Sequence, residues 1–218
     1  MHAEIIVIGD ELLIGQVTDT NSGMIARELN AIGIDIHTTT VIHDRREDIL
    51  SALETALERT DIVLLTGGLG PTNDDITKLT LTHFFNTKLV EDMQVKQHIE
   101  ALYENRPQVF NSLTATQWQV PEDCHILTNR VGSAPIMYFE RGRKKVFSMP
   151  GVPYEAEVAM KEQIVPILRN LSDSSICHRT ILLEGIPESA LALKIAEWEN
   201  SLPQNMHLAY LPQNRMIR

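Results

Sequence analysis

Two nearly uninterrupted apolar runs, at residues 3–9 and 61–66, narrow the possible folds of this chain. Runs of this kind are typical of central parallel strands that are buried on both faces. A third segment, 34–42, alternates and is rich in β-branched residues, as strands are. Helical patterns follow the three segments at 21–33, at 44–57 and from near Asp74. Three strand-helix units in succession predict a three-layer α/β/α fold with a mostly parallel sheet.

The rest of the chain divides into a completion of this domain and a smaller unit. We expect a helix at 89–103, an excursion at 106–121 over the sheet edge, a hairpin of strands at 135–140 and 144–149, and a last helix at 150–168. The first domain is therefore predicted to cover residues 1–170. Residues 171–218 predict a short linker, strands at 176–184 and 207–210, and a helix at 188–199. This unit is too small to bury a core alone, so we interpret it as the truncated start of a small α+β domain, or as an element completed by another chain.

Composition excludes several classes of protein. The 218 residues carry 29 acidic and 19 basic side chains, a net charge of −10 that disfavours a nucleic-acid partner. The two cysteines predict neither a disulfide framework nor a structural metal. No apolar run is long enough to cross a membrane, and the N-terminus lacks the features of a secretory signal, so we expect a cytoplasmic protein.

The sequence TGGLGPTNDDIT at residues 66–77 lies where a strand end meets a helix start. Open α/β sheets bind ligands at this place, and glycines there let a phosphate approach main-chain N–H groups and the helix dipole. The sequence is neither a Walker loop nor a dinucleotide fingerprint. A tight turn capped by Asp74 would leave a second carboxylate, Asp75, and Thr77 unexplained. The candidate phosphate-binding residues in this loop are Thr66, Gly67, Gly68, Gly70, Pro71, Thr72, Asp74 and Thr77.

Carboxylates after the first strand suggest a metal site. Asp10 and Glu11 would face Asp75 across neighbouring strand ends, an arrangement that suits hydrated Mg²⁺ or another divalent metal. These three residues are our catalytic and metal-binding candidates. The alternative is that Glu11 only caps a helix or forms an ion pair.

Other polar residues near predicted helix starts have structural interpretations. Asn21, Ser22 and Asp44 are expected to cap helices. A second helix N-terminus near Gly151 and Pro153 could hold another phosphate or a carbonyl group. Glu155 in its first turn is either a ligand or a partner of the helix dipole.

Four motifs, in order along the chain, resemble the CinA family of competence- and damage-inducible proteins. They are TGGLGPTNDDIT at 66–77, GDELLIGQ at 9–16 with DTN at 19–21, GSAP at 132–135 and PGVPYE at 150–155. The resemblance covers residues 1 to about 170 and implies the molybdopterin-binding fold of MogA and MoaB. It adds Asn21 and Ser133 to the candidate ligand-binding residues and suggests that Asp44 borders the pocket.

The resemblance implies a metal-dependent ADP-ribose diphosphatase that yields AMP and ribose 5-phosphate. Two alternatives stay open: a catalytically silent nucleotide- or molybdopterin-binding module, and a molybdopterin adenylyltransferase-like enzyme. Ala115 and Thr116 stand where the family carries basic residues, which favours the silent module, and Ile136 replaces a glycine. We expect no amidase activity from this chain. We also expect a homodimer, because Leu191, Ile195 and Trp198 need a surface against which to pack.

Overall fold

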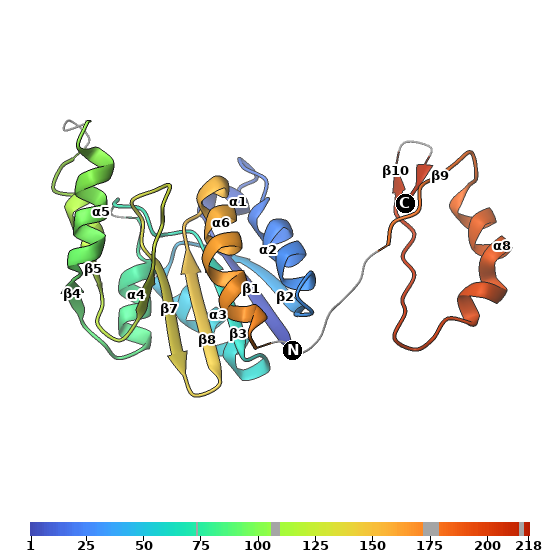
Figure 1. Ribbon diagram of the computed structural model, residues 1–218, viewed down its shortest axis with the longest axis horizontal. Helices are drawn as coiled ribbons and strands as arrows, with labels where there is room; N and C mark the ends of the chain where they lie inside the picture. The colour runs from blue at the N-terminus through green and yellow to red at the C-terminus, as the bar shows by residue number, and fades with distance from the viewer. Residues whose placement is uncertain (73, 106–109, 172–178, 214–215) are drawn as a thin grey trace. The chain divides into compact units, whose positions relative to one another are not determined.

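The computed structural model describes residues 1–72, 74–105, 110–171, 179–213 and 216–218. The chain divides into two compact units, Met1–Ile176 and Cys177–Arg218. The first contains a six-stranded sheet of order β2-β1-β3-β8-β7-β6 (Figure 1). Pairing is parallel from β2 to β8 and antiparallel from β8 through β7 to β6, which confirms the predicted mostly parallel sheet. The strands are β1 (His2–Ile8), β2 (Asp35–Ile42), β3 (Ile62–Thr66), β6 (His125–Leu127), β7 (Ile136–Arg141) and β8 (Lys144–Met149).

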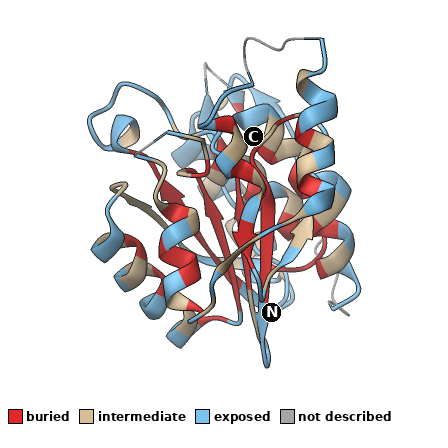
Figure 2. Ribbon diagram, turned by 90° about the vertical axis from the view of Figure 1, so that its left-hand side faces the viewer, coloured by how far each residue is buried: buried red, intermediate tan, exposed pale blue. Residues whose placement is uncertain are grey.

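Helices cover both faces of this sheet (Figures 1 and 2). Ile5 and Val7 of β1 pack in one core cluster, and Ile6 and Ile8 pack in the other. Both faces of β1 are therefore buried, which explains its continuous apolar sequence. One layer comprises α2 (Asn21–Asn30), α6 (Pro153–Ala159), the π-helical turn η2 (Met160–Ile164) and α7 (Val165–Arg169), and the other comprises α3 (Arg46–Arg59) and α4 (Thr77–Phe84).

An excursion between α4 and β6 forms its own small core. It consists of β4 (Leu89–Glu91), α5 (Met93–Tyr103), the 3₁₀ turn η1 (Thr114–Trp118) and β5 (Gln119–Pro121), and β4 pairs with β5. The prediction of a helix from residue 89 was wrong at its start. Asp92 caps α5, because its Oδ1 accepts hydrogen bonds from the N–H groups of Gln94 and Val95 at 2.8 and 2.9 Å. The three residues before this cap are thereby left free to pair as a strand.

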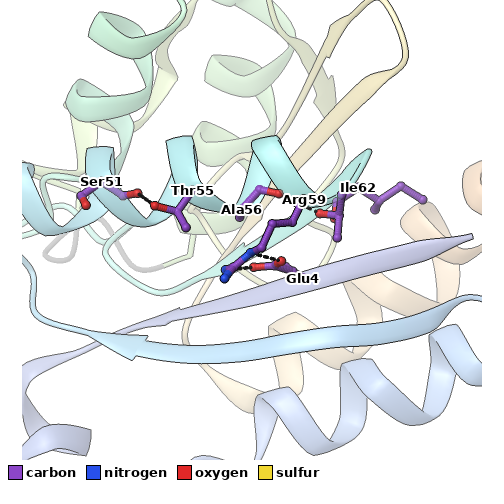
Figure 3. A network of polar contacts seen from close by, with 7 residues as sticks. Glu4, Ser51, Thr55, Ala56, Arg59 and Ile62 are labelled. Atoms are coloured by element: carbon purple, nitrogen blue, oxygen red, sulfur yellow. Dashed lines mark hydrogen bonds and ion pairs between the residues drawn. The ribbon is translucent and has the colours of Figure 1, made fainter.

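One charged side chain interrupts the apolar sequence of β1. Glu4 is 1% exposed, and its two carboxylate oxygens accept hydrogen bonds from Nε and Nη2 of Arg59 at 2.9 and 2.8 Å (Figure 3). Arg59 is the last residue of α3, so this two-point ion pair ties the end of a covering helix to the central strand.

Within its described residues, the second unit contains a three-stranded antiparallel sheet and one helix. Its elements are β9 (Leu183–Glu184), α8 (Glu188–Asn200), β10 (Pro212–Gln213) and β11 (Met216–Ile217), with strand order β10-β11-β9. The predicted strand at 207–210 was wrong, since pairing begins at Pro212 and the Tyr210 hydroxyl instead donates to Glu199 at 2.7 Å. The predicted strand at 176–184 is paired only at its last two residues, and its positions 176–178 lie outside the described residues.

No helix in the described ranges is long and apolar enough to cross a membrane.

Candidate functional site

A cleft of about 500 Å³ lies at the carboxyl ends of the parallel strands. Its wall includes residues that follow β1, β2, β3 and β8, because the ends of parallel strands meet at one edge of the sheet. Segments far apart in sequence are thus brought together there. The candidate residues that line the cleft are Glu11, Asp44, Gly67, Gly68, Gly70, Pro71, Asp74, Asp75, Ser133, Gly151 and Glu155.

Two consecutive glycines make the turn after β3, and they have different roles. The Gly67 N–H donates to the carbonyl of Met149 at 3.1 Å, so it ties β3 to β8 and is not available to a ligand. The Gly68 N–H has no hydrogen-bond partner among the described residues. Gly68 has φ of +65°, and a Cβ there would overlap Thr77 Oγ1 and lie 2.9 Å from Asp44 Oδ1. Glycine at this position therefore permits both the backbone turn and the close approach of these two side chains.

Asn21 and Thr66 form a buried brace behind the cleft. Asn21 Nδ2 donates to Thr66 Oγ1 at 3.0 Å and to the carbonyl of Gly151 at 2.9 Å. Thr66 Oγ1 in turn donates to the carbonyl of Pro150 at 2.9 Å. These bonds hold the loops after β3 and β8 at a set distance, so both residues support the cleft wall without lining it.

The prediction that Asn21 and Ser22 cap α2 was wrong. No side chain caps the helix at its N-cap residue, Thr20. The side chain of Asp19 bonds to this end of the helix instead, since its Oδ1 accepts a hydrogen bond from the Ser22 N–H at 3.1 Å. The amide of Asn21 is thereby left to make its long-range contacts.

The other predicted helix starts also shifted. Asp44 does not cap α3, whose N-cap is Arg45 without a side-chain cap. The helix expected from near Asp74 begins at Thr77, and the helix expected from Pro150 begins at Pro153. In each case the residues before the helix turn into the cleft wall or its rim.

The cleft concentrates negative charge around Asp44. Partial burial, and then the charges of Asp10, Glu11 and Asp75, raise the pKa of Asp44 to about 6. Asp44 Oδ1 is buried without a hydrogen-bond partner in the described part of the chain. No lysine or arginine is among the described residues that line the cleft.

Asp10 lies outside the cleft wall. It begins the short helix α1 (Asp10–Leu13) and is exposed. Its Oδ1 is 2.6 Å from Nδ1 of His43, and this hydrogen bond lowers the pKa of Asp10. Glu11, the next residue, is the member of the pair that reaches the cleft.

Asp75 lines the cleft and also holds its own loop. Its Oδ2 accepts hydrogen bonds from the Thr72 hydroxyl and from the Thr72 N–H, the latter at 3.0 Å. Thr72 and Asp74 are exposed at the rim, whereas Thr77 is fully buried beneath Gly68. Within the described residues, no group of three or more His, Cys, Asp or Glu side chains is arranged to hold a metal ion.

The opposite wall is built on Asn129, a buried residue that links two loops. Its Nδ2 donates to the carbonyl of Ala134 at 2.9 Å and to Glu155 Oε2 at 2.7 Å. This amide fixes Glu155 beside Ser133 in the wall. Pro153 lies apart from them and lines a smaller neighbouring pocket with Asn21.

Gln117 lines the cleft but is not among the residues that the sequence predicted for the site. It is 1% exposed, lines the cleft from η1, and donates from Nε2 to the carbonyl of Leu69 at 3.0 Å. The excursion thus contributes to the site. Nothing in the sequence singles it out, because it is one glutamine in a segment of mixed composition.

The comparisons with known proteins agree with this geometry. The family described as "Probable molybdopterin binding domain" matches residues 4–170. A CinA-like protein of Cytophaga hutchinsonii is 45% identical over 97% of this chain and 51% of its own length. The crystal structure of the protein CinA from Thermoplasma acidophilum matches with a TM-score of 0.70. The match covers 76% of this chain and 97% of that one, at 31% sequence identity. The tungsten cofactor synthesizing protein MoaB of Pyrococcus furiosus shares the fold, with a TM-score of 0.51, at 20% identity over 78% of this chain and 95% of that one.

The chain spans about half the length of the curated relatives that it matches. Its family is shown by the matched domain and by these identities. The chain belongs to the CinA-like proteins, with a molybdopterin-binding domain of the MogA and MoaB fold.

Proposed function

We propose that the domain hydrolyses ADP-ribose to AMP and ribose 5-phosphate with the help of a divalent cation. The observation that carries the proposal is the concentration of carboxylates without counter-charge beside a glycine turn. Such a surface attracts a phosphorylated ligand only together with a cation, because phosphate alone would be repelled.

The residues present fit a cation that is held partly by its ligand. Partial burial and the neighbouring carboxylates raise the pKa of Asp44, and its buried Oδ1 has no hydrogen-bond partner among the described residues. Mg²⁺ usually takes one or two carboxylates and completes its shell with water and substrate phosphates, so a site with three protein carboxylates is not required. One or two carboxylates among Asp75, Glu11 and Asp44, the last in place of Asp10, would hold it. The bound cation would polarise the phosphoryl oxygens and offset their charge.

The main chain supplies the other half of the phosphate site. The N–H groups of Gly68 and Gly70 have no partner among the described residues, and the N-terminus of α4 adjoins the same turn, since the Thr77 N–H donates to the Gly68 carbonyl at 3.2 Å. These groups would orient the diphosphate and stabilise the charge that develops as water attacks one phosphorus. The bond from that phosphorus to the bridging oxygen then breaks, which leaves AMP and ribose 5-phosphate.

The test is the substitution Asp75→Asn. Asparagine keeps an oxygen that can accept the Thr72 hydrogen bonds but removes the charge, so we expect the turn to persist and Mg²⁺-dependent release of AMP to fall at least about 100-fold. AMP would be followed by chromatography with Mg²⁺ and with EDTA, and folding by urea unfolding. Asp123→Asn, at an exposed turn away from the cleft, is the matched control and should keep full activity. Undiminished turnover in Asp75→Asn, or none in the parent chain, would contradict the proposal.

A second candidate is a binding module without catalysis. It is favoured by the absence of a three-residue metal group in the described residues and by Ala115 and Thr116 at positions that are basic in the family. Calorimetry with ADP-ribose separates the two functions when it is paired with the AMP assay. Tight binding without AMP would select the module, and affinity for a pterin phosphate alone would point to the molybdenum cofactor pathway.

A further inference from the structure

We infer that Gln117 determines ligand specificity by accepting a hydrogen bond from a hydroxyl or amino group of the ligand in the cleft. The inference deepens the proposed function and rests on it, since it requires that a nucleoside diphosphate sugar or a similar ligand occupies the cleft. Gln117 does not touch the reacting phosphates in this assignment.

The orientation of the Gln117 amide is set by Leu69. Nε2 donates to the Leu69 carbonyl at 3.0 Å. The reversed amide would place Oε1 against that carbonyl oxygen, where two acceptors repel each other. The free end of the side chain is therefore Oε1, an acceptor.

That acceptor is buried and has no partner. Gln117 is 1% exposed, and Oε1 makes no hydrogen bond within the described residues. Buried polar atoms in folded proteins are nearly always paired, so an unpaired one beside a cleft indicates where a ligand group completes the pairing. Gln117 is among the residues that line this cleft.

The chemistry of the partner follows from what can donate to an amide oxygen. Phosphate oxygens at neutral pH only accept, so the diphosphate of a ligand cannot satisfy Oε1. A sugar O–H or an amino N–H can. The charged side chains of the cleft wall are all carboxylates and Ser133 adds one hydroxyl, so donors in the pocket come mainly from the main chain and from the ligand. The part of the ligand that carries hydroxyl or amino groups is thus the part that Gln117 selects.

The experiment combines protein variants with ligand analogues. Binding is measured by calorimetry, with Ca²⁺ in place of Mg²⁺ to separate it from turnover. The ligands are ADP-ribose, its 2′,3′-dideoxyadenosine analogue, its inosine analogue, and ADP, which lacks the second ribose. Together these remove the adenosine hydroxyls, the adenine amine and the terminal sugar one at a time.

We expect Gln117→Met to weaken ADP-ribose binding about tenfold, the value of one hydrogen bond in a desolvated site. For the analogue that lacks the recognised group, the parent chain and Gln117→Met should bind within about twofold of each other. Each comparison is a ratio between ligands on one protein, so a general loss of stability cancels.

Equal losses for all four ligands in Gln117→Met would overturn the inference and leave only a structural role for the bond to Leu69. If the parent chain binds the ligands but the inference fails in this way, the proposed function still stands. If the parent chain binds none of them, the proposed function and this inference fall together.

Discussion

Replacing Asp44 with asparagine should stabilise the free protein while it weakens cation binding. The pKa of Asp44 is raised from 3.8 to about 6 by partial burial and by the neighbouring carboxylates Asp10, Glu11 and Asp75. Above pH 6 the folded protein therefore bears the free-energy cost of an ionised, crowded carboxylate. The Asp44→Asn side chain has nearly the same shape and carries no charge.

The expected gain in the free energy of unfolding follows from the raised pKa of Asp44. About two pKa units correspond to roughly 3 kcal/mol, because each unit is worth about 1.4 kcal/mol. Asp44 is only partly buried, so solvent screening reduces this to about 1 kcal/mol. The sign follows from proton linkage: a carboxyl whose folded pKa is raised binds its proton more tightly in the folded state, so wild-type stability falls as pH rises from about 4 to 6. The advantage of Asp44→Asn should be absent at pH 4, grow to pH 6 and stay constant above it.

Urea unfolding at pH 4, 5, 6 and 7 measures this difference directly. At pH 7, millimolar Mg²⁺ should raise the unfolding midpoint of the wild type more than that of Asp44→Asn, which narrows the gap between them. Asp123→Asn serves as the exposed control. A variant that is less stable than the wild type at pH 7, or a difference that does not vary with pH, would refute the charge-crowding argument.

Two further substitutions test the support of the site. Gly68→Ala should cost about 2 kcal/mol in urea unfolding, because it forces a side chain at positive φ against Thr77, whereas Gly142→Ala, at a similar φ of +63° with open space around it, should cost only about 1 kcal/mol. Equal costs would show that packing around Gly68 is looser than described. Arg59→Met should cost about 3 kcal/mol by leaving Glu4 buried without a partner, and adding Glu4→Gln should recover part of that loss; no recovery would argue against the ion pair.

The fold could be predicted because its main signals are local. The continuous apolar sequence of β1 arises from burial on both faces, and the hairpin of β7 and β8 from two apolar runs around a short basic turn. The predicted starts of the helices were less accurate, because several neighbouring side chains can cap a helix. At α2 the capping oxygen comes from Asp19 and not from Asn21.

The composition of the site was only partly predictable. The glycine loop and the acidic residues after β1 stand out because their types and spacing have few other uses. Gln117 did not stand out, since a single glutamine in a mixed segment gives no sign that it will be buried. The Gly67 N–H was also expected to face the ligand, whereas it bonds to Met149 on the neighbouring strand.

The amino-acid sequence alone determined the three strand-helix units of the parallel sheet, the loop that follows β3 and the family, because each depends on patterns within a few tens of residues. Tertiary structure decided which polar groups remain free to act. The Nδ2 group of Asn21 bonds to Thr66 and to Gly151, which is 130 residues away, while Asp44 and Gln117 in the cleft wall keep buried oxygens without partners in the described chain. Such pairing depends on distances across the folded sheet, and local sequence does not encode those distances.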